Sequence, residues 1–191
     1  EGLTNNRVTC AIQDSRGYLW IGTEDGLNRY DGYGFEAYRH TVGDKFSISD
    51  NYIQSVYEAK NGDVFVGTRF GGLNKWSRAS NRFEQLQKQS EAENSLPENE
   101  ICGILETDSG SLWVKTRNYL ASVDFVNKQA TAYGHFSTMF KADEYCSYPL
   151  LKTKNGTILV GTKDGLSLFD PAKKTFVRIR LAYTSSDYFQ G

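Results

Sequence analysis

The sequence contains few of the residues that would identify an enzyme, a metalloprotein or a membrane protein. Among its 191 residues there are two histidines, three cysteines, three prolines and one methionine. The opposite charges nearly cancel, to a net charge of −1 at pH 7, so no basic face is predicted and nucleic acid is not expected as a partner. No apolar run approaches the length of a membrane-spanning helix, and we expect no membrane contact by this segment.

The few reactive side chains are also unfavourably spaced. Cys10, Cys102 and Cys146 lie far apart without metal-type spacing, so at most one disulfide is expected. Cys10 and Cys102 fall on predicted strands, where a small buried thiol is favoured over a redox role. His40 and His135 lie in linkers without an adjacent nucleophile motif, which favours solvated loop residues. We therefore predict no catalytic residue, no cofactor and no metal.

The sequence does contain one short motif, which is repeated four times. Each copy has a glycine, an apolar run and a threonine, at residues 17–23, 62–68, 110–116 and 156–162. The copies recur every 45 to 48 residues or so, a period typical of stacked-repeat architectures. The chain is therefore predicted to consist of four structural repeats.

Each repeat divides into four short strands. The apolar run before the threonine is too continuous for a strand with one face in water, so both of its faces must be covered. A tight turn such as residues 24–26 follows, because Asp-Gly before a new strand is a strong hairpin signal. We expect first strands over 8–14, 53–59 and 101–107, third strands over 27–30, 73–76, 120–123 and 166–169, and fourth strands beginning near Phe35, Phe83 and Phe176.

Such units stack face to face around an axis, which is how a β-propeller avoids exposed sheet edges. We predict an all-β fold of β-propeller blades, with four consecutive four-stranded antiparallel repeats in a single segment over residues 1–191. The approximate blades are residues 4–39, 52–87, 100–133 and 147–183. A barrel or sandwich is the alternative, but neither explains a four-strand period. Because no strand is left over to close a ring, we expect a fragment of a larger propeller whose end blades favour self-association.

The first repeat carries the fullest set of motif residues. Asp14 and Gly17 precede the Leu-Trp-Ile-Gly-Thr run of residues 19–23, and the Gly-Leu-Asn-Arg-Tyr-Asp run of residues 26–31 follows. A similar linker motif occurs at residues 47–53 and again at residues 94–101. These motifs resemble the two-component regulator propeller family across essentially the whole chain.

The resemblance implies the periplasmic sensor region of a hybrid two-component system. In that family the propellers precede an immunoglobulin-like module, a membrane span, a histidine kinase and a receiver. The resemblance thus implies a non-catalytic sensory or ligand-recognition segment of an inner-membrane-anchored sensor, with the parent's other domains and an oligosaccharide from polysaccharide breakdown as partners. The alternatives are a propeller enzyme, such as a lyase or hydrolase, and a pure protein-interaction scaffold. A tight inward cluster of histidine with carboxylates would favour the enzyme.

Two repeats depart from the common pattern. In the third, Lys115 replaces a packing glycine and Tyr119 replaces a turn glycine, which implies looser packing or a changed surface. In the second, the turn over residues 69–72 is one residue longer than its equivalent. The third linker, residues 134–145, is unusually apolar for a loop. We expect it to cover its own blade, with a partner interface as the alternative.

The predicted ligand site follows from the blade geometry. The long linkers, roughly residues 39–52, 87–100 and 133–147, share one face with the turns between second and third strands, and long loops on a rigid scaffold commonly carry recognition. Cations follow the repeat threonine in three consecutive blades, and aromatic residues lie beside them. An arginine pair can hold a carboxylate or sulfate, and aromatic rings can stack on sugars. The predicted ligand-binding residues for an acidic oligosaccharide are Arg69, Phe70, Arg117, Tyr119 and Lys163. Solvated turn residues are the alternative interpretation.

Overall fold

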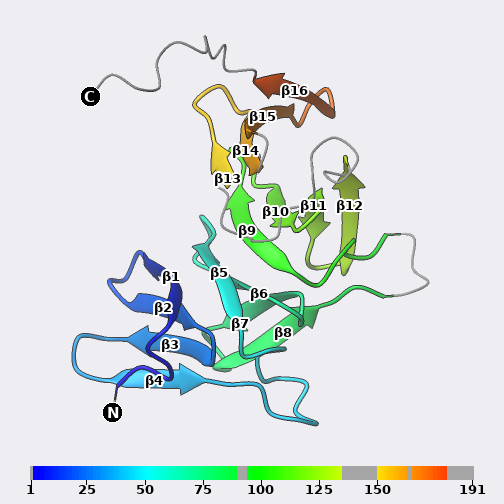
Figure 1. Cartoon of the computed structure of the whole chain (residues 1–191). Coiled ribbons are helices and arrows are strands. Elements are labelled where there is room, and N and C mark those ends of the chain that lie inside the picture. The colour runs from blue at the N-terminus through cyan, green and yellow to red at the C-terminus, as the bar shows by residue number, and fades with distance from the viewer. Residues whose placement is uncertain (1, 90–93, 135–149, 163–164, 180–191) are drawn as a thin grey trace, which may run out of the picture.

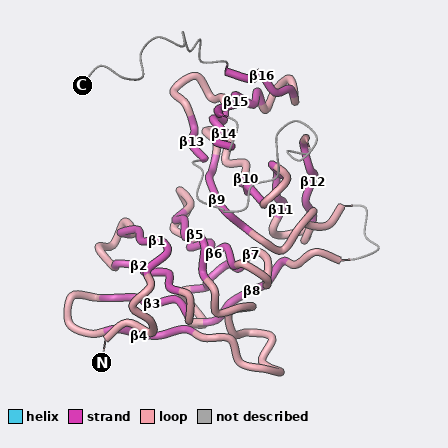
Figure 2. The backbone as a smooth tube through the Cα atoms, in the orientation of Figure 1, coloured by secondary structure: helices cyan, strands magenta, loops and turns pink. Residues whose placement is uncertain are grey.

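The computed structural model describes residues 2–89, 94–134, 150–162 and 165–179, and every regular element in these ranges is a β-strand (Figure 2). Sixteen strands form four antiparallel sheets of four strands, each in the order of the sequence. The predicted all-β fold of four successive four-stranded repeats is therefore confirmed.

Each sheet is one blade, named here in chain order. Blade one contains β1 (Val8–Gln13), β2 (Leu19–Thr23), β3 (Gly26–Tyr30) and β4 (Phe35–Tyr38). Blade two contains β5 (Ile53–Glu58), β6 (Val64–Thr68), β7 (Leu73–Ser77) and β8 (Arg82–Leu86). Blade three contains β9 (Ile101–Glu106), β10 (Leu112–Thr116), β11 (Leu120–Asp124) and β12 (Gln129–Tyr133). Blade four contains β13 (Leu150–Lys152), β14 (Ile158–Thr162), β15 (Gly165–Asp170) and β16 (Thr175–Ile179).

The blades follow one another in an open arc. The first strands of neighbouring blades contact one another, β1 with β5, β5 with β9 and β9 with β13. In Figure 1, blade one and blade four lie at opposite ends of the arc. The four blades do not close a ring, as expected for a fragment of a larger propeller.

The repeated threonine has a structural role in the turn after the second strand. Thr23, Thr68 and Thr116 are fully buried. The Thr23 hydroxyl donates to the Gly26 carbonyl at 2.9 Å and accepts the Asp25 N–H at 3.1 Å. The other two threonines make the same pair of bonds in their own turns. A buried hydroxyl that satisfies two turn groups explains why threonine recurs at this position in the first three repeats.

A buried asparagine ties the preceding linker to each of the first two blades. Asn28 accepts the Thr4 N–H at 3.0 Å and donates to the Thr4 hydroxyl at 2.8 Å. Asn74 makes the same two bonds with Ser49, at 3.0 and 2.8 Å. The linker side chain of Ile48 is fully buried beside blade two. These two linker segments therefore have a fixed position over the blades that follow them.

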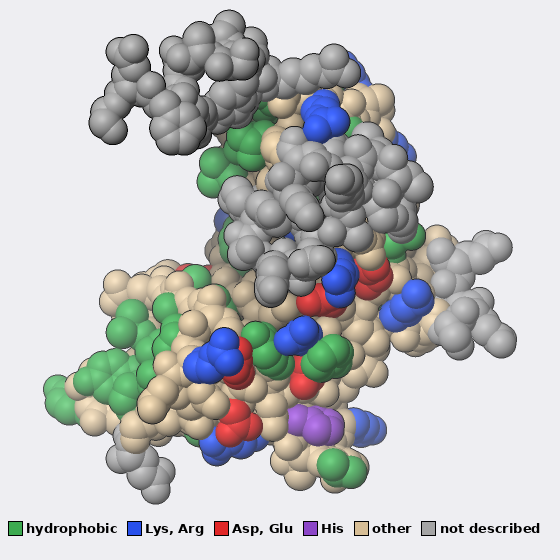
Figure 3. All heavy atoms as spheres, viewed as in Figure 1, with side chains coloured by type: hydrophobic (Ala, Val, Ile, Leu, Met, Phe, Trp, Pro, Cys, Tyr) green, Lys and Arg blue, Asp and Glu red, His purple; other side chains and the backbone are tan. Residues whose placement is uncertain are grey.

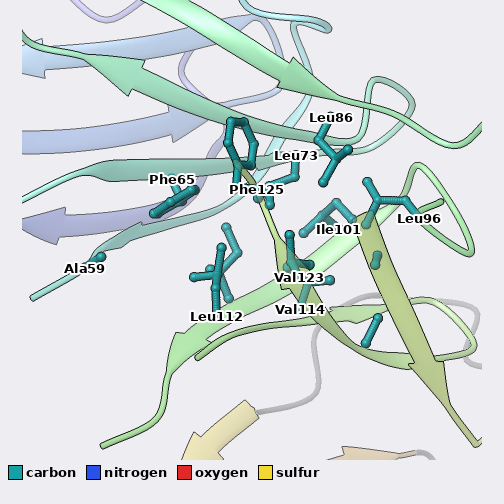
Figure 4. Close-up of a cluster of buried hydrophobic side chains, with 13 residues drawn as sticks. Ala59, Phe65, Leu73, Leu86, Leu96, Ile101, Leu112, Val114, Val123 and Phe125 are labelled. Atoms are coloured by element: carbon teal, nitrogen blue, oxygen red, sulfur yellow. The ribbon is translucent and has the colours of Figure 1, made fainter. Parts of the chain in front are cut away.

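The apolar core is divided among the interfaces between blades. Between blades two and three it is mostly aliphatic, and the labelled side chains of Figure 4, such as Leu73, Leu86 and Val123, converge between the two sheets. Phe65 meets Phe125 edge to face, with centroids 5.6 Å apart. The other two interfaces are aromatic. They contain Trp20, Tyr38, Trp76 and Phe83 between blades one and two, and Trp113, Tyr133, Phe169 and Phe176 between blades three and four.

Lys115, the predicted departure from the packing glycine, is fully buried. In blades one and two the glycine on the second strand pairs with Cys10 or Ser55 on the first strand. In blade three Lys115 pairs with Gly103, so the small residue has moved across to the neighbouring strand. The substitution therefore changes the interior of the blade.

Tyr119 also fits its turn without backbone strain. The equivalent glycines of the other blades have positive φ, at 124° for Gly26, 81° for Gly72 and 122° for Gly165, whereas Tyr119 does not. Its N–H donates to the Thr116 hydroxyl at 3.0 Å, which closes the turn.

The interpretation of Cys102 as a buried thiol is wrong, because Cys102 forms a disulfide. Cys10 is a free cysteine, and burial raises the pKa of its thiol, consistent with the expected inert packing role. Cys146 lies outside the described residues. Spacing in the sequence could not reveal the disulfide, because the bond depends on distances that only the fold defines.

Candidate functional site

The face that carries the predicted site is built from turns held against linkers. We call it the long-loop face and define it by the turns at residues 24–26, 69–72 and 117–119 with the linker segments 49–52 and 97–100. In blade two, the Arg69 N–H donates to the Tyr52 carbonyl at 3.0 Å and the Phe70 N–H donates to Asp50 Oδ2 at 2.9 Å. In blade three, the Asn118 N–H donates to Glu98 Oε2 at 2.9 Å.

Arg69 is the central feature of this face. Its guanidinium carbon lies 5.0 Å from the centroid of the Tyr52 ring and 5.2 Å from that of the Phe70 ring. Phe70 is 67% exposed. Within the described ranges, Arg69 forms no ion pair with a carboxylate. The two rings orient an exposed arginine whose N–H groups can hold a carboxylate or sulfate.

Tyr52 is itself fixed by blade one. Its hydroxyl donates to Glu24 Oε1 at 3.0 Å, and Arg7 Nε lies 3.3 Å from the same oxygen. Burial raises the pKa of Tyr52, and the bond to Glu24 acts in the same direction. Glu24 therefore serves as an anchor for the ring that supports Arg69, across the junction of blades one and two.

Arg117 has a different environment from Arg69. Its NH1 atom lies 3.8 Å from Glu100 Oε2, and Gln54 Nε2 donates to the other oxygen of Glu100 at 3.2 Å. Arg117 is thus already paired with a carboxylate, and a ligand anion would compete with Glu100.

The structure brings two of the five predicted residues together, Arg69 and Phe70. Tyr119 lies in the turn two residues after Arg117. Lys163 lies outside the described residues, so the convergence of three cations stays a prediction. The sequence reasoning missed Tyr52 and Glu100. Both belong to linkers that end beside the turns, and their place on the shared face was the signal that could have identified them.

Charges of both signs are mixed over the surface. Figure 3 shows basic, acidic and apolar side chains side by side on the viewed face, in place of a large patch of one sign. His40 Nδ1 lies 2.9 Å from the Ile48 carbonyl oxygen, so this histidine is tied to its own linker. Among the described residues, no three histidine, cysteine or acidic side chains are grouped as metal ligands. All but the first residue of the apolar segment 134–145 lies outside the described ranges.

Comparison with known proteins identifies the repeats. The family model "Two component regulator propeller" matches residues 2–25 and 47–70, which are the linker and first two strands of blades one and two. A histidine kinase from Formosa agariphila is 47% identical over 49 residues, which cover 26% of this chain and 4% of the kinase.

Solved structures share the fold. An extracellular domain from B. thetaiotaomicron, described as part of a hybrid two component system, is 25% identical with a TM-score of 0.69. The match covers 92% of this chain and 30% of that domain. A virginiamycin B lyase from Staphylococcus aureus is 12% identical with a TM-score of 0.67, covering 95% of this chain and 58% of the lyase. The likeness to the lyase shows the fold alone.

The chain therefore spans 4% of the histidine kinase and 30% of the extracellular domain that it matches. No helix in the described ranges is long and apolar enough to cross a membrane. The similarity to the extracellular domain of a two-component sensor indicates an extracytoplasmic, sensory propeller segment. The chain carries propeller repeats of the two-component regulator family.

Proposed function

We propose that this chain is a non-catalytic ligand-recognition segment of a periplasmic two-component sensor, and that its ligand is an acidic oligosaccharide derived from a polysaccharide. The parent is then an inner-membrane-anchored histidine kinase, whose other domains are the partners of this segment. The similarity to a histidine kinase and to an extracellular sensor domain supports this assignment.

The arrangement of Arg69 is the observation that carries the ligand class. An exposed guanidinium flanked by Tyr52 and Phe70 offers charge for a carboxylate and ring faces for the apolar side of a sugar. Arg117, Tyr119 and Lys163 extend the proposed site along the same face. A neutral sugar would use the rings alone and would leave the arginine without a partner, so an acidic sugar fits better.

The end blades supply a surface for further contacts. Large apolar side chains are exposed at both ends of the arc, with Val8 and Leu19 on blade one and Leu151 and Val177 on blade four. Neighbouring blades of the parent, or a second copy of this segment, would cover them. Self-association of the isolated segment is therefore part of the proposal.

Calorimetric titration with an oligogalacturonate tests the ligand class. Replacing Arg69 with alanine should weaken binding at least tenfold, which corresponds to about 1.4 kcal/mol, while the melting temperature stays nearly unchanged. Arg117→Ala should have a smaller effect, because Glu100 already competes for that guanidinium. Arg82→Ala is the matched control, since Arg82 also lies over an aromatic ring, 4.9 Å from the Phe46 centroid, but at the start of β8. Equal affinities for the Arg69 and Arg82 variants would refute the proposed site.

A further inference from the structure

A pocket of about 440 Å³ lies between blades three and four, on the face opposite the long-loop face. The turn between β9 and β10 forms one wall, and the turns after β13 and β15 form the other. This volume lies within the range of small-molecule sites. Of the five residues predicted from the sequence, the four that the structure describes do not line it.

Trp113 lines the pocket and has an unusual indole group. It is only 4% exposed, and its Nε1 has no hydrogen-bond partner in the part of the chain that the structure describes. The equivalent Trp20 of blade one donates to Asp14 Oδ2 at 3.0 Å. A buried indole N–H normally has such a partner, so the orphaned donor of Trp113 calls for an acceptor from elsewhere.

One residue difference between the repeats explains why the Trp113 indole has no acceptor. Thr107 lies six residues before Trp113, as Asp14 does before Trp20. The Thr107 hydroxyl bonds within its own turn, to Ser109 Oγ at 2.9 Å and to the Ser111 carbonyl at 3.3 Å. The shorter Thr107 side chain thus does not replace the Asp14 carboxylate as an acceptor for the indole of blade three.

The lining favours an uncharged ligand rich in hydroxyl groups. Hydroxyl and amide groups cover both walls, from Ser109 and Ser111 on one side and Asn155 and Thr157 on the other. The two carboxylates among the described lining residues already have cationic partners. Asp108 bonds to Lys152, and Asp170 lies 3.2 Å from Lys173. An anion would meet these carboxylates, whereas a polyol can both donate to them and accept from the indole.

We propose that this pocket binds a neutral sugar ring, one of whose oxygens accepts the Trp113 N–H in the place that the Asp14 carboxylate occupies in blade one. Pro171 and Ala172 supply apolar lining for the face of the ring. The site lies on the opposite face from Arg69 and does not depend on the acidic-oligosaccharide proposal.

Nuclear magnetic resonance of the indole N–H groups tests this directly, because the chain has only three tryptophans. The methyl glycosides of glucose, galactose and mannose are titrated into the ¹⁵N-labelled protein, and Trp113→Phe assigns the Trp113 signal. We expect one glycoside to shift the Trp113 signal in a saturable manner while those of Trp20 and Trp76 stay in place. No saturable shift with any of the three, or equal shifts of all indole signals, would overturn the proposal.

Variants of the pocket sharpen the test. Thr107→Asn places an amide oxygen where Asp14 Oδ2 lies in blade one and should abolish the saturable shift. Thr175→Asn, on the exposed start of β16, is the control and should leave it intact. If Thr107→Asn disturbs the fold, as seen in the Trp20 and Trp76 signals, Asn155→Ala on the opposite wall decides, with an expected loss of affinity of several fold. Retention of full affinity in the folded variant refutes the site. Arg69→Ala should leave the Trp113 shift unchanged, which separates the two proposals.

Discussion

The interface between blades one and two and the interface between blades three and four share an aromatic frame but differ in their polar groups. Trp20 and Trp76 lie 4.9 Å apart at 65°, and their equivalents Trp113 and Phe169 lie 5.2 Å apart at 58°. All four aromatic positions are retained in both interfaces. The repeated sequence therefore determines this aromatic frame, because it places aromatic residues at the same positions in both interfaces.

In the first interface a network of charges and amides closes the edge of this frame. Asp14 accepts the N–H groups of Arg16 and Tyr18 as well as the Trp20 indole, and lies 3.7 Å from Arg78 NH2. Asn81 accepts the Trp76 indole N–H at 3.0 Å. The buried donors on both sides of the interface are thereby satisfied.

In the other interface the matching positions carry smaller or differently charged groups. Thr107 replaces Asp14, Pro171 replaces Arg78 and Lys174 replaces Asn81. The Trp113 indole is left without an acceptor in the described residues, and a pocket opens beside it. The difference teaches that aromatic packing holds a blade interface together, while the polar residues at its edge decide whether the interface is closed.

The largest expected effect is the loss of Asp14. Asp14→Ala leaves the Trp20 indole and Arg78 without their partner and should destabilise the protein by about 3 kcal/mol. Thr107→Ala removes only hydroxyl bonds within a turn and should cost about 1 kcal/mol. Urea denaturation midpoints measure both variants. Equal shifts would show that the two interfaces do not differ in the way described.

Glycines on the first and second strands, where neighbouring blades meet, provide a second comparison between the two interfaces. A Cβ on Gly22 would lie 2.6 Å from Cys10 Sγ and 2.7 Å from Ile53 Cγ2, across the first interface. A Cβ on Gly103 would lie 3.2 Å from Leu150 Cβ, across the interface with blade four. Gly22→Ala should therefore cost about 2 kcal/mol and Gly103→Ala under about 1 kcal/mol. Melting temperatures that fall equally, or further for Gly103→Ala, would contradict this ranking.

The smallest expected effect concerns the turn after the third strand, which should behave alike in blades one and four. Asp31 of blade one and Asp170 of blade four begin equivalent turns, and backbone N–H groups hold the pKa of each carboxyl below its usual 3.8. Because the folded pKa is lowered, their stabilisation is complete above the unfolded value and is lost as the pH falls through the folded value.

Carboxyl titration by nuclear magnetic resonance should thus give midpoints below 3.8 for both residues. Asp170→Asn should be slightly less stable than the parent protein at neutral pH, and this difference should vanish in strong acid. A normal midpoint for either carboxyl would show that its turn is not held as described.

Much of this architecture could be predicted from local patterns. Alternating hydrophobicity, Asp-Gly turns and a fixed period predicted four strands in each of four repeats. Arg69 and Phe70 are consecutive in the sequence, and a single tight turn carries both. Tyr52 was missed because its contact with Arg69 joins the two ends of the β5–β6 hairpin.

The sequence by itself determined the number of blades, the order of their strands and the recurrence of the turn threonine, because these depend on interactions within one repeat. Only the tertiary structure determined which side chains contact one another between strands and across blades. The move of the small residue from the position of Lys115 to Gly103 depends on strand pairing, and the disulfide of Cys102 depends on distances in space. The orphaned indole of Trp113 depends on what the neighbouring blade places beside it, and a repeat read alone contains no information about its neighbour's side chains.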